Sequence, residues 1–303
     1  MENRKLIILI ILLLNLLVFQ PIFGYEIETH AYLTSEIVKF YNDHFSNKIP
    51  KELIPYLIDG SRKEDQYPRW MNHFYDPVYN RGLTEDAAIE STYRLGNWQK
   101  SKDWANDSNN QNKSTYKVPT TIASILTAIE QRKISAITSE TDFTWKRGLK
   151  FYIQGDKEKA MYILGHILHL IEDASVPDHT RNDPHPEGSP YEKYSAKYNL
   201  NNSDPDLEKR LNNKKPIILS SLDDYFDNLA KYSNNNFYSK DTIDVRSGYK
   251  NPYPIDFEEK NDLRFALGKD EGYFYKLYVQ PIESSVLINV KGQITIDNGQ
   301  VLS

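Results

Sequence analysis

The segment LGHILHLIEDASVPDHT, residues 164–180, places three of the chain's seven histidines and two aspartates in an otherwise apolar setting. A helix turns about 100° per residue, so His166, His169 and Asp173 would lie within about 60° of one another on one face. Burying imidazole and carboxylate groups without partners costs several kcal/mol, so this face must meet polar or charged groups. The helix should end before Pro177, because the residue that precedes a proline is disfavoured in the α region.

Histidines elsewhere in the chain also lie close to acidic residues. They are His30 in YEIETH, His73 in NHFYDP, which follows Asp65 in GSRKED, and His179 just beyond the helix stop. The chain has no cysteine, so its metal ligands would be neutral imidazoles and carboxylates, a set that suits zinc and similar divalent ions. A buried pair of His169 and Asp173 that satisfies itself is the simpler alternative, but it leaves the other histidines unexplained.

Such a ligand set is suited to the hydrolysis of phosphodiesters, whose negative charge repels nucleophiles. Bound divalent ions neutralise that charge, lower the pKa of a water molecule and hold the attacking and leaving oxygens in line. Two ions about 3.5–4 Å apart need a bridging ligand, and the carboxylate of Asp173 can bridge where a single imidazole nitrogen cannot. Each ligating histidine also needs an acceptor on its second nitrogen. Candidates for that acceptor are Glu64, Asp76, Glu172 and Asp178.

Taken in order, the segments YEIETH, GSRKED, NHFYDP, HLIEDASVPDH and SPYE resemble the bacterial zinc-dependent phospholipases C. The fungal single-strand-specific zinc nucleases share that family's helical fold and metal cluster. The spacing of His169, Asp173 and His179 matches the central motif of the family, and the run before it, residues 143–169, is also similar. The resemblance covers residues 25–194 and implies an all-α fold with a single multi-helix domain.

The resemblance implies a cluster of two to three zinc ions. In the family, the amino group and carbonyl of the processed N-terminal residue bind one ion together with the first motif histidine, here Tyr25 and His30. The second ion would be bound by Asp65, His73 and His169, while Asp173 would bridge the first two ions. His179 and Glu192 belong to the third ion. Only backbone atoms of Tyr25 take part, so a tyrosine can serve there once the chain has been cleaved.

The third site departs from the family pattern. The family normally supplies a further histidine four residues before the glutamate that matches Glu192, and this chain has Gly188 there. His185, three residues earlier, is one replacement for the missing ligand. The alternatives are that water completes the ligand shell, or that the site is weak or empty.

The resemblance also implies that Asp65 orients or deprotonates the attacking water in addition to binding a metal ion. Trp70 lies where the phospholipases carry an aromatic residue of the headgroup pocket, and Tyr67 would add a second wall. The face of a tryptophan attracts a quaternary ammonium by about 0.5–2 kcal/mol. Ordinary packing is the alternative role for both aromatic residues.

Three functions remain open. We favour a secreted phospholipase C, which releases a phosphorylated headgroup and diacylglycerol. A single-strand-specific nuclease is less consistent with a net charge of −5 and the absence of a basic cluster that would track a nucleic-acid strand. The third function is a non-catalytic metal-binding protein of the same fold. We therefore expect a phospholipid substrate, peripheral membrane contact as an option, no stable nucleic-acid binding, and a monomer.

Residues 1–24 have the layout of a secretory signal peptide, because Arg4 and Lys5 precede a mostly apolar stretch from Leu6 to Phe19. This stretch is short for a membrane span, which takes about twenty residues, and an uncleaved anchor is the alternative. Cleavage after Gly24 would leave a mature domain of residues 25–303 that is secreted or periplasmic.

The elements that must position these side chains are mostly helices. Apolar residues at helical spacing predict helices over residues 33–45, 119–137 and 216–232, and two more within 141–174 that break at Gly155-Asp156. Polar stretches predict surface loops over 100–118, 199–215 and 233–262. After Leu200 the chain reads as largely helical and loop-like, and alternation over residues 286–303 allows a short C-terminal β-hairpin.

Overall fold

The computed structural model describes residues 26–66, 69–84, 98–115, 141–185 and 189–237, positions 239, 242 and 249, and the backbone of five C-terminal strands. The expected signal peptide, Tyr25, Tyr67, Gly188 and the helix expected over 119–137 lie outside the described residues. Among the helices that are described, none is long and apolar enough to cross a membrane. The single mature domain of residues 25–303 remains a prediction.

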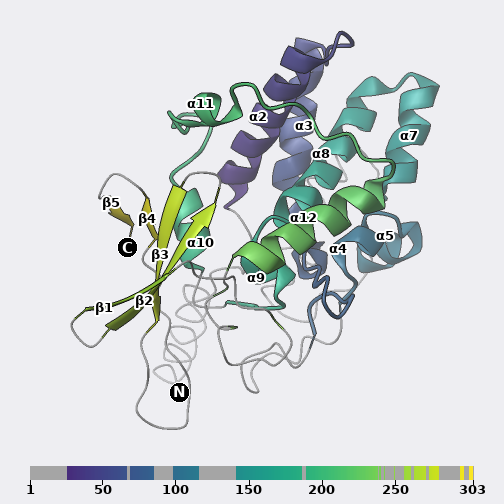
Figure 1. Cartoon of the computed structure of the whole chain (residues 1–303). Coiled ribbons are helices and arrows are strands. Elements are labelled where there is room, and N and C mark those ends of the chain that lie inside the picture. Colours follow the sequence, from purple (N-terminus) through teal and green to yellow (C-terminus); the bar gives the residue numbers. More distant parts are fainter. Residues whose placement is uncertain are drawn as a thin grey trace, which may run out of the picture.

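The described part of the chain is predominantly helical, as the sequence predicted (Figure 1). Its helices in chain order are α2 (Ile27–His44), η1 (Lys51–Leu53), α3 (Ile54–Glu64), η2 (Arg69–Asn72), α4 (Ser101–Trp104), α5 (Ser108–Thr115), α7 (Trp145–Gln154), α8 (Lys157–Asp173), α9 (Pro177–Thr180), α10 (Pro190–Ser195), α11 (Leu207–Leu211) and α12 (Leu222–Asn236). Helix α8 packs against α3, α7 and α2, and α12 crosses α9, α4 and α8.

The predicted break between α7 and α8 is confirmed. Gly155 ends α7 in the left-handed conformation, with φ of 89°, which glycine adopts without steric penalty. Asp156 then caps α8, and its side chain accepts a hydrogen bond from the backbone amide of Lys159. The predicted stop is confirmed as well, because α8 ends at Asp173 and Pro177 begins the short helix α9.

Helices α3 and α8 approach one another backbone to backbone at two glycines. A Cβ atom on Gly60 would lie 1.9 Å from the carbonyl oxygen of Tyr162, and one on Gly165 would lie 2.1 Å from that of Leu57. Any larger residue at either position would force the helices apart. This contact sets the distance between the histidine-bearing face of α8 and the C-terminal end of α3.

The polar segment expected as a surface loop over residues 100–118 instead contains α4 and α5 and is partly buried. The Trp104 side chain is 1% exposed, and Gln111 is fully buried. Trp104 joins a hydrophobic cluster made of Tyr75, Trp104, Ala105, Ile167, Leu170, Ala174, Phe226 and Ala230. The prediction of a surface loop was wrong because the Trp104 side chain packs in the core beneath α12 and holds this otherwise hydrophilic stretch in place.

Two other segments differ in detail from the sequence prediction. The loop expected over 199–215 contains the short helix α11. The helix expected over 216–232 begins only at Leu222, after Ser221 caps it by accepting a hydrogen bond from the amide of Asp224. The preceding apolar pair, Ile217 and Ile218, is exposed and not helical.

The C-terminal region forms small antiparallel sheets. Strands β1 (Asp256–Lys260), β2 (Leu263–Asp270) and β3 (Tyr273–Val279) pair in the order β1-β2-β3. Strands β4 (Ile294–Ile296) and β5 (Gln300–Leu302) pair with Ile294 opposite Leu302, which confirms the terminal hairpin. The helical and loop-like character expected after Leu200 is therefore wrong for the residues that form β1, β2 and β3. The β3 sequence YFYKLYV is rich in the aromatic residues that favour strands.

Substituting Gly60 tests the importance of the contact between α3 and α8. Gly60→Ala should cost about 3 kcal/mol of unfolding free energy in denaturant titrations, because its Cβ would meet the backbone of Tyr162. The matched control is Gly155→Ala, which has open space but a positive φ and should cost about 1 kcal/mol. Equal costs for the two variants would contradict the tight contact.

Candidate metal centre

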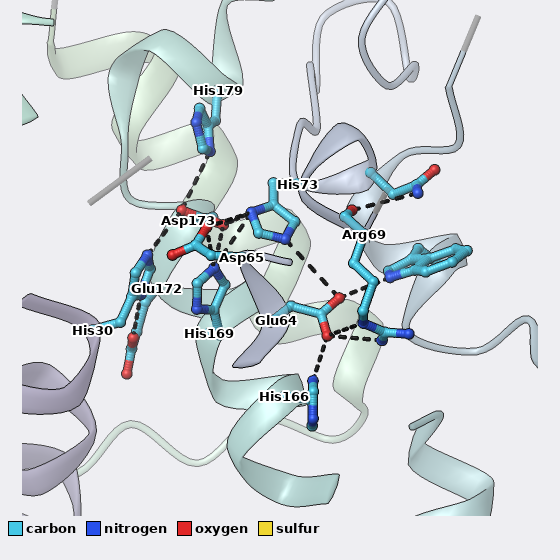
Figure 2. Close-up of polar contacts among 12 residues, drawn as sticks. His30, Glu64, Asp65, Arg69, His73, His166, His169, Glu172, Asp173 and His179 are labelled. Carbon is cyan, nitrogen blue, oxygen red and sulfur yellow. Dashed lines mark hydrogen bonds and ion pairs between the residues drawn. The ribbon is translucent and has the colours of Figure 1, made fainter. Parts of the chain in front are cut away.

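Six acidic and histidine side chains, which lie on or directly after five different helices, converge at one point (Figure 2). Helix α2 supplies His30, and Asp65 follows the last residue of α3. His73 follows η2, and His169 and Asp173 lie one turn apart on α8. Helix α9 supplies His179, which the turn at Pro177 brings back to the end of α8.

The Asp173 carboxylate lies at the centre of this group. Its Oδ1 atom is 3.5 Å from His30 Nε2 and 3.3 Å from His179 Nδ1. Its Oδ2 atom is 2.8 Å from His73 Nδ1 and 3.2 Å from His169 Nε2. Each oxygen thus faces a different pair of imidazoles, which is the arrangement that a bridging ligand requires.

Two overlapping sets of ligand atoms can each hold a metal ion. One set is His30, His169 and Asp173, and the other is Asp65, His73 and His169. Within each set the ligand atoms lie within 4.8 Å of one another, and all the residues are buried. A self-satisfied pair of His169 and Asp173 does not account for this convergence. The residues that were singled out far apart in the sequence therefore meet in space.

The donor chemistry of the centre fits divalent cations. Both carboxylate oxygens of Asp65 and of Asp173 are buried and accept no hydrogen bond from the described residues. Such an unpaired buried acceptor costs roughly 1–3 kcal/mol, and more when charged. Imidazole nitrogens approach these oxygens without hydrogen-bond geometry, as expected of side chains that share a cation. Nitrogen and oxygen donors without thiolate match the preferences of zinc.

The electrostatics of the centre favour positive charge. Burial alone would raise the pKa of Asp173, but the imidazole of His179 and those of the neighbouring histidines hold it well below its ordinary value. Burial alone would lower the pKa of His169, but the carboxylates of Asp65 and Asp173 hold it well above its ordinary value. The Asp173 carboxylate thus stays ionised and attracts cations in a setting of low dielectric.

A third set of ligand atoms lies beside the first two. It consists of His179, His185 and Glu192, all buried and within 4.8 Å of one another. His185 Nε2 is 2.7 Å from Glu192 Oε1, and His185 Nδ1 is 2.6 Å from the carbonyl oxygen of Asp183, an arrangement in which Nδ1 donates. His185 thus offers Nε2 to the same point as the ligand atoms of His179 and Glu192.

A fourth set, made of Asp178, Asp183 and His185, overlaps the third. His185 Nδ1 already contacts the Asp183 carbonyl, and Asp178 Oδ2 accepts a hydrogen bond from Ser189. Burial raises the pKa of Asp178 to about 7, which disfavours a charged carboxylate. We therefore interpret this set as support for His185 and not as a separate ion site.

Acceptors on the second ring nitrogens orient the candidate ligands. His30 Nδ1 is 2.7 Å from Glu172 Oε2, which agrees with the sequence prediction for Glu172. His169 Nδ1 is 2.7 Å from the carbonyl oxygen of Ser61, a backbone acceptor that sequence reasoning missed because it has no side-chain signal. Asp76 has a different role from the one predicted. It accepts hydrogen bonds within its own turn and from Tyr249.

Glu64 lies at the centre of a second buried network, next to the cluster (Figure 2). Its carboxylate accepts hydrogen bonds from Arg69 at 2.7 Å and Trp104 at 2.8 Å, and His166 Nδ1 is 2.5 Å away. Burial lowers the pKa of His166 to about 4, so this imidazole is neutral. Burial alone would raise the pKa of Glu64, but Arg69, His166 and His73 together hold it well below its ordinary value and keep Glu64 ionised. His73 Nε2 lies 4.0 Å from Glu64 Oε1.

The expected substrate-binding residues are placed only in part. Trp70 is half-buried and packs with Trp98 against the cluster of Met71, Phe74 and Leu83. This packing is the alternative role that the sequence left open, and a headgroup wall at Trp70 remains a prediction. Tyr67 lies outside the described residues, as does the Tyr25 amino terminus.

Comparison with known proteins adds little to the site geometry. No family model matches the chain. No curated protein matches it. Among solved structures, it is similar to an alpha toxin from Clostridium absonum at 13% identity with a TM-score of 0.41, over 92% of this chain and 86% of that chain. A likeness this weak does not establish a shared fold.

Removing the Glu64 charge should destabilise the fold. Glu64→Gln leaves the Arg69 guanidinium buried without its counter-charge, and breaking a buried pair in this way costs about 3–5 kcal/mol. Glu28→Gln removes the carboxylate of a partly exposed pair with Arg62 and should cost less than about 1 kcal/mol. Denaturant titration of both variants without metal measures the difference. Similar costs would show that the Glu64 network is not a structural anchor.

Proposed function

We propose that the protein is a secreted, zinc-dependent phosphodiester hydrolase of the phospholipase C type. The observation that supports this proposal most strongly is the convergence of His30, His73, His169 and His179 on the buried carboxylate of Asp173. A structural role alone does not call for a carboxylate that faces four imidazoles without a hydrogen bond.

The residues suggest how two to three ions would be shared. His30 and Asp173 would hold the first ion together with the Tyr25 amino terminus that cleavage releases. Asp65, His73 and His169 would hold the second, with Asp173 between the two. His179, His185 and Glu192 would hold the third.

Bound divalent cations would neutralise the charge of a phosphodiester and lower the pKa of a water molecule. The chain's own groups would do the rest. Asp65 has two carboxylate oxygens without hydrogen bonds from the described residues, so one can bind a cation while the other orients the attacking water or accepts its proton. Burial of the ligands strengthens every electrostatic contact at the reacting phosphate.

The sequence favours phospholipid over nucleic acid as the substrate. A net charge of −5 gives little attraction for a polyanionic strand. Trp70 and Tyr67 would line the headgroup pocket, where an aromatic face can hold a quaternary ammonium group. We propose a monomer that acts outside the cytoplasm and contacts membranes only peripherally.

An activity panel on zinc-loaded mature protein tests this function. It compares p-nitrophenylphosphorylcholine, phospholipid micelles and single-stranded DNA, each with and without a chelator. We expect diacylglycerol release that the chelator abolishes and zinc restores. Cleavage of DNA alone would instead support a nuclease.

Substitutions of the candidate metal ligands test whether the hydrolytic activity depends on the Asp173 cluster. His169→Ala and Asp173→Asn should abolish turnover, because His169 would be a ligand of the second ion and Asp173 would lie between the first two ions. His44→Ala is the matched control, since His44 is exposed, its ring nitrogens contact backbone carbonyls, and its ring lies against Phe40 and not against the cluster. Full turnover in His169→Ala and Asp173→Asn would rule out both the phospholipase and the nuclease.

Zinc stoichiometry tests the role of His185. His185→Ala should bind one ion fewer than the unsubstituted protein in an equilibrium titration, because it removes a nitrogen from the set with His179 and Glu192. The ions at the Asp173 cluster should be retained. If both proteins bind the third ion, water and not His185 completes its ligand shell. If neither protein binds it, the third site is empty.

A further inference from the structure

The imidazole of His30 lies between two successive carboxylates of α8. Its Nε2 atom faces Asp173 Oδ1 at 3.5 Å, and its Nδ1 atom lies 2.7 Å from Glu172 Oε2 (Figure 2). His30 is fully buried and Glu172 is 4% exposed. The contact is short enough for a charge-assisted hydrogen bond in which Nδ1 donates and the Glu172 carboxylate accepts.

Glu172 is itself held in place from α2. The Thr34 hydroxyl donates a hydrogen bond to Glu172 Oε1 at 2.8 Å, and Thr34 is fully buried. Thr34 lies one helical turn after His30, so one face of α2 contacts both oxygens of the same carboxylate. These two contacts restrict the rotation of the Glu172 side chain and direct its Oε2 atom at the imidazole of His30.

The acceptor on His30 differs in charge from those on the other candidate ligands. His169 Nδ1 contacts the carbonyl oxygen of Ser61, and His185 Nδ1 contacts that of Asp183. His73 Nε2 is 4.0 Å from Glu64, beyond hydrogen-bond distance. Among the described candidate ligands, His30 alone has a carboxylate within hydrogen-bond distance of its outward nitrogen.

We propose that Glu172 is a positioning residue for the first cation. Its carboxylate keeps the proton of His30 on Nδ1, so that Nε2 presents its lone pair next to Asp173, and it adds negative charge at this position alone. The inference rests on the proposed metal centre but not on the reaction catalysed there. Outer partners of ligating histidines typically contribute about 10–100-fold to metal affinity.

The test is a zinc competition titration of Glu172→Gln, with a chromophoric chelator as the competitor. Glutamine keeps the shape and an oxygen acceptor but removes the charge. We expect one ion to bind about 10–100-fold more weakly, with the affinities of the remaining ions unchanged. An ¹⁵N spectrum of the histidine rings should show His30 protonated on Nδ1 in the unsubstituted protein and a mixture of tautomers in Glu172→Ala.

Thr34→Val provides a second variant in case the Glu172 substitutions fold poorly. It removes only the hydroxyl that orients the carboxylate, so the same ion should weaken by a smaller factor. Unchanged affinity for every ion in both Glu172→Gln and Thr34→Val, or an equal loss at all ions, would overturn the proposal. If the unsubstituted protein binds zinc but hydrolyses no phosphodiester, the proposed function fails while the role of Glu172 stands.

Discussion

The structure depends on the placement of the Asp173 carboxylate, which is fully buried and faces four imidazoles. An ionised carboxylate in a low-dielectric interior must be matched by positive charge, either protons on its neighbouring histidines or bound cations. Asp65 adds a second buried carboxylate to the same point. The surrounding helices must therefore hold the Asp65 and Asp173 carboxylates close together, and the packing of these helices makes that possible.

Close packing of α3 on α8 does most to hold the charged side chains of the cluster together. Glycines at positions 60 and 165 let the two backbones touch, and this brings the Ser61 carbonyl to His169 and the end of α3 to the cluster. Beside it, the ion pair of Glu64 and Arg69 forms a compensated network that joins α3, η2, α4 and α8. The negative charge of Glu64 is balanced by a permanent positive charge on Arg69, whereas those around Asp173 are balanced only by protons on the histidines or by added cations.

Local signals in the sequence predicted much of the site. The stripe on α8, the break at Gly155 and the stop before Pro177 follow from helical spacing and from backbone conformations that neighbouring residues impose. The Ser61 acceptor could not be predicted, because a backbone carbonyl has no side-chain signature. Burial of Trp104 depends on contacts with residues far away in the sequence, such as Phe226, which local composition does not encode. Strands β1, β2 and β3 pair with their sequence neighbours and were missed because this stretch has no clear alternation of apolar and polar residues. The place of His185 depends on a loop conformation, with φ of 34°, that spacing alone leaves open.

Anomalous X-ray diffraction at the zinc absorption edge tests the central claim most directly. Crystals of the mature protein equilibrated with zinc should show anomalous peaks within bonding distance of the Asp173 carboxylate, with one on the side of His30 and one on the side of His73. Zinc found only at surface carboxylates, with no peak beside Asp173, would contradict the metal centre and the function inferred from it.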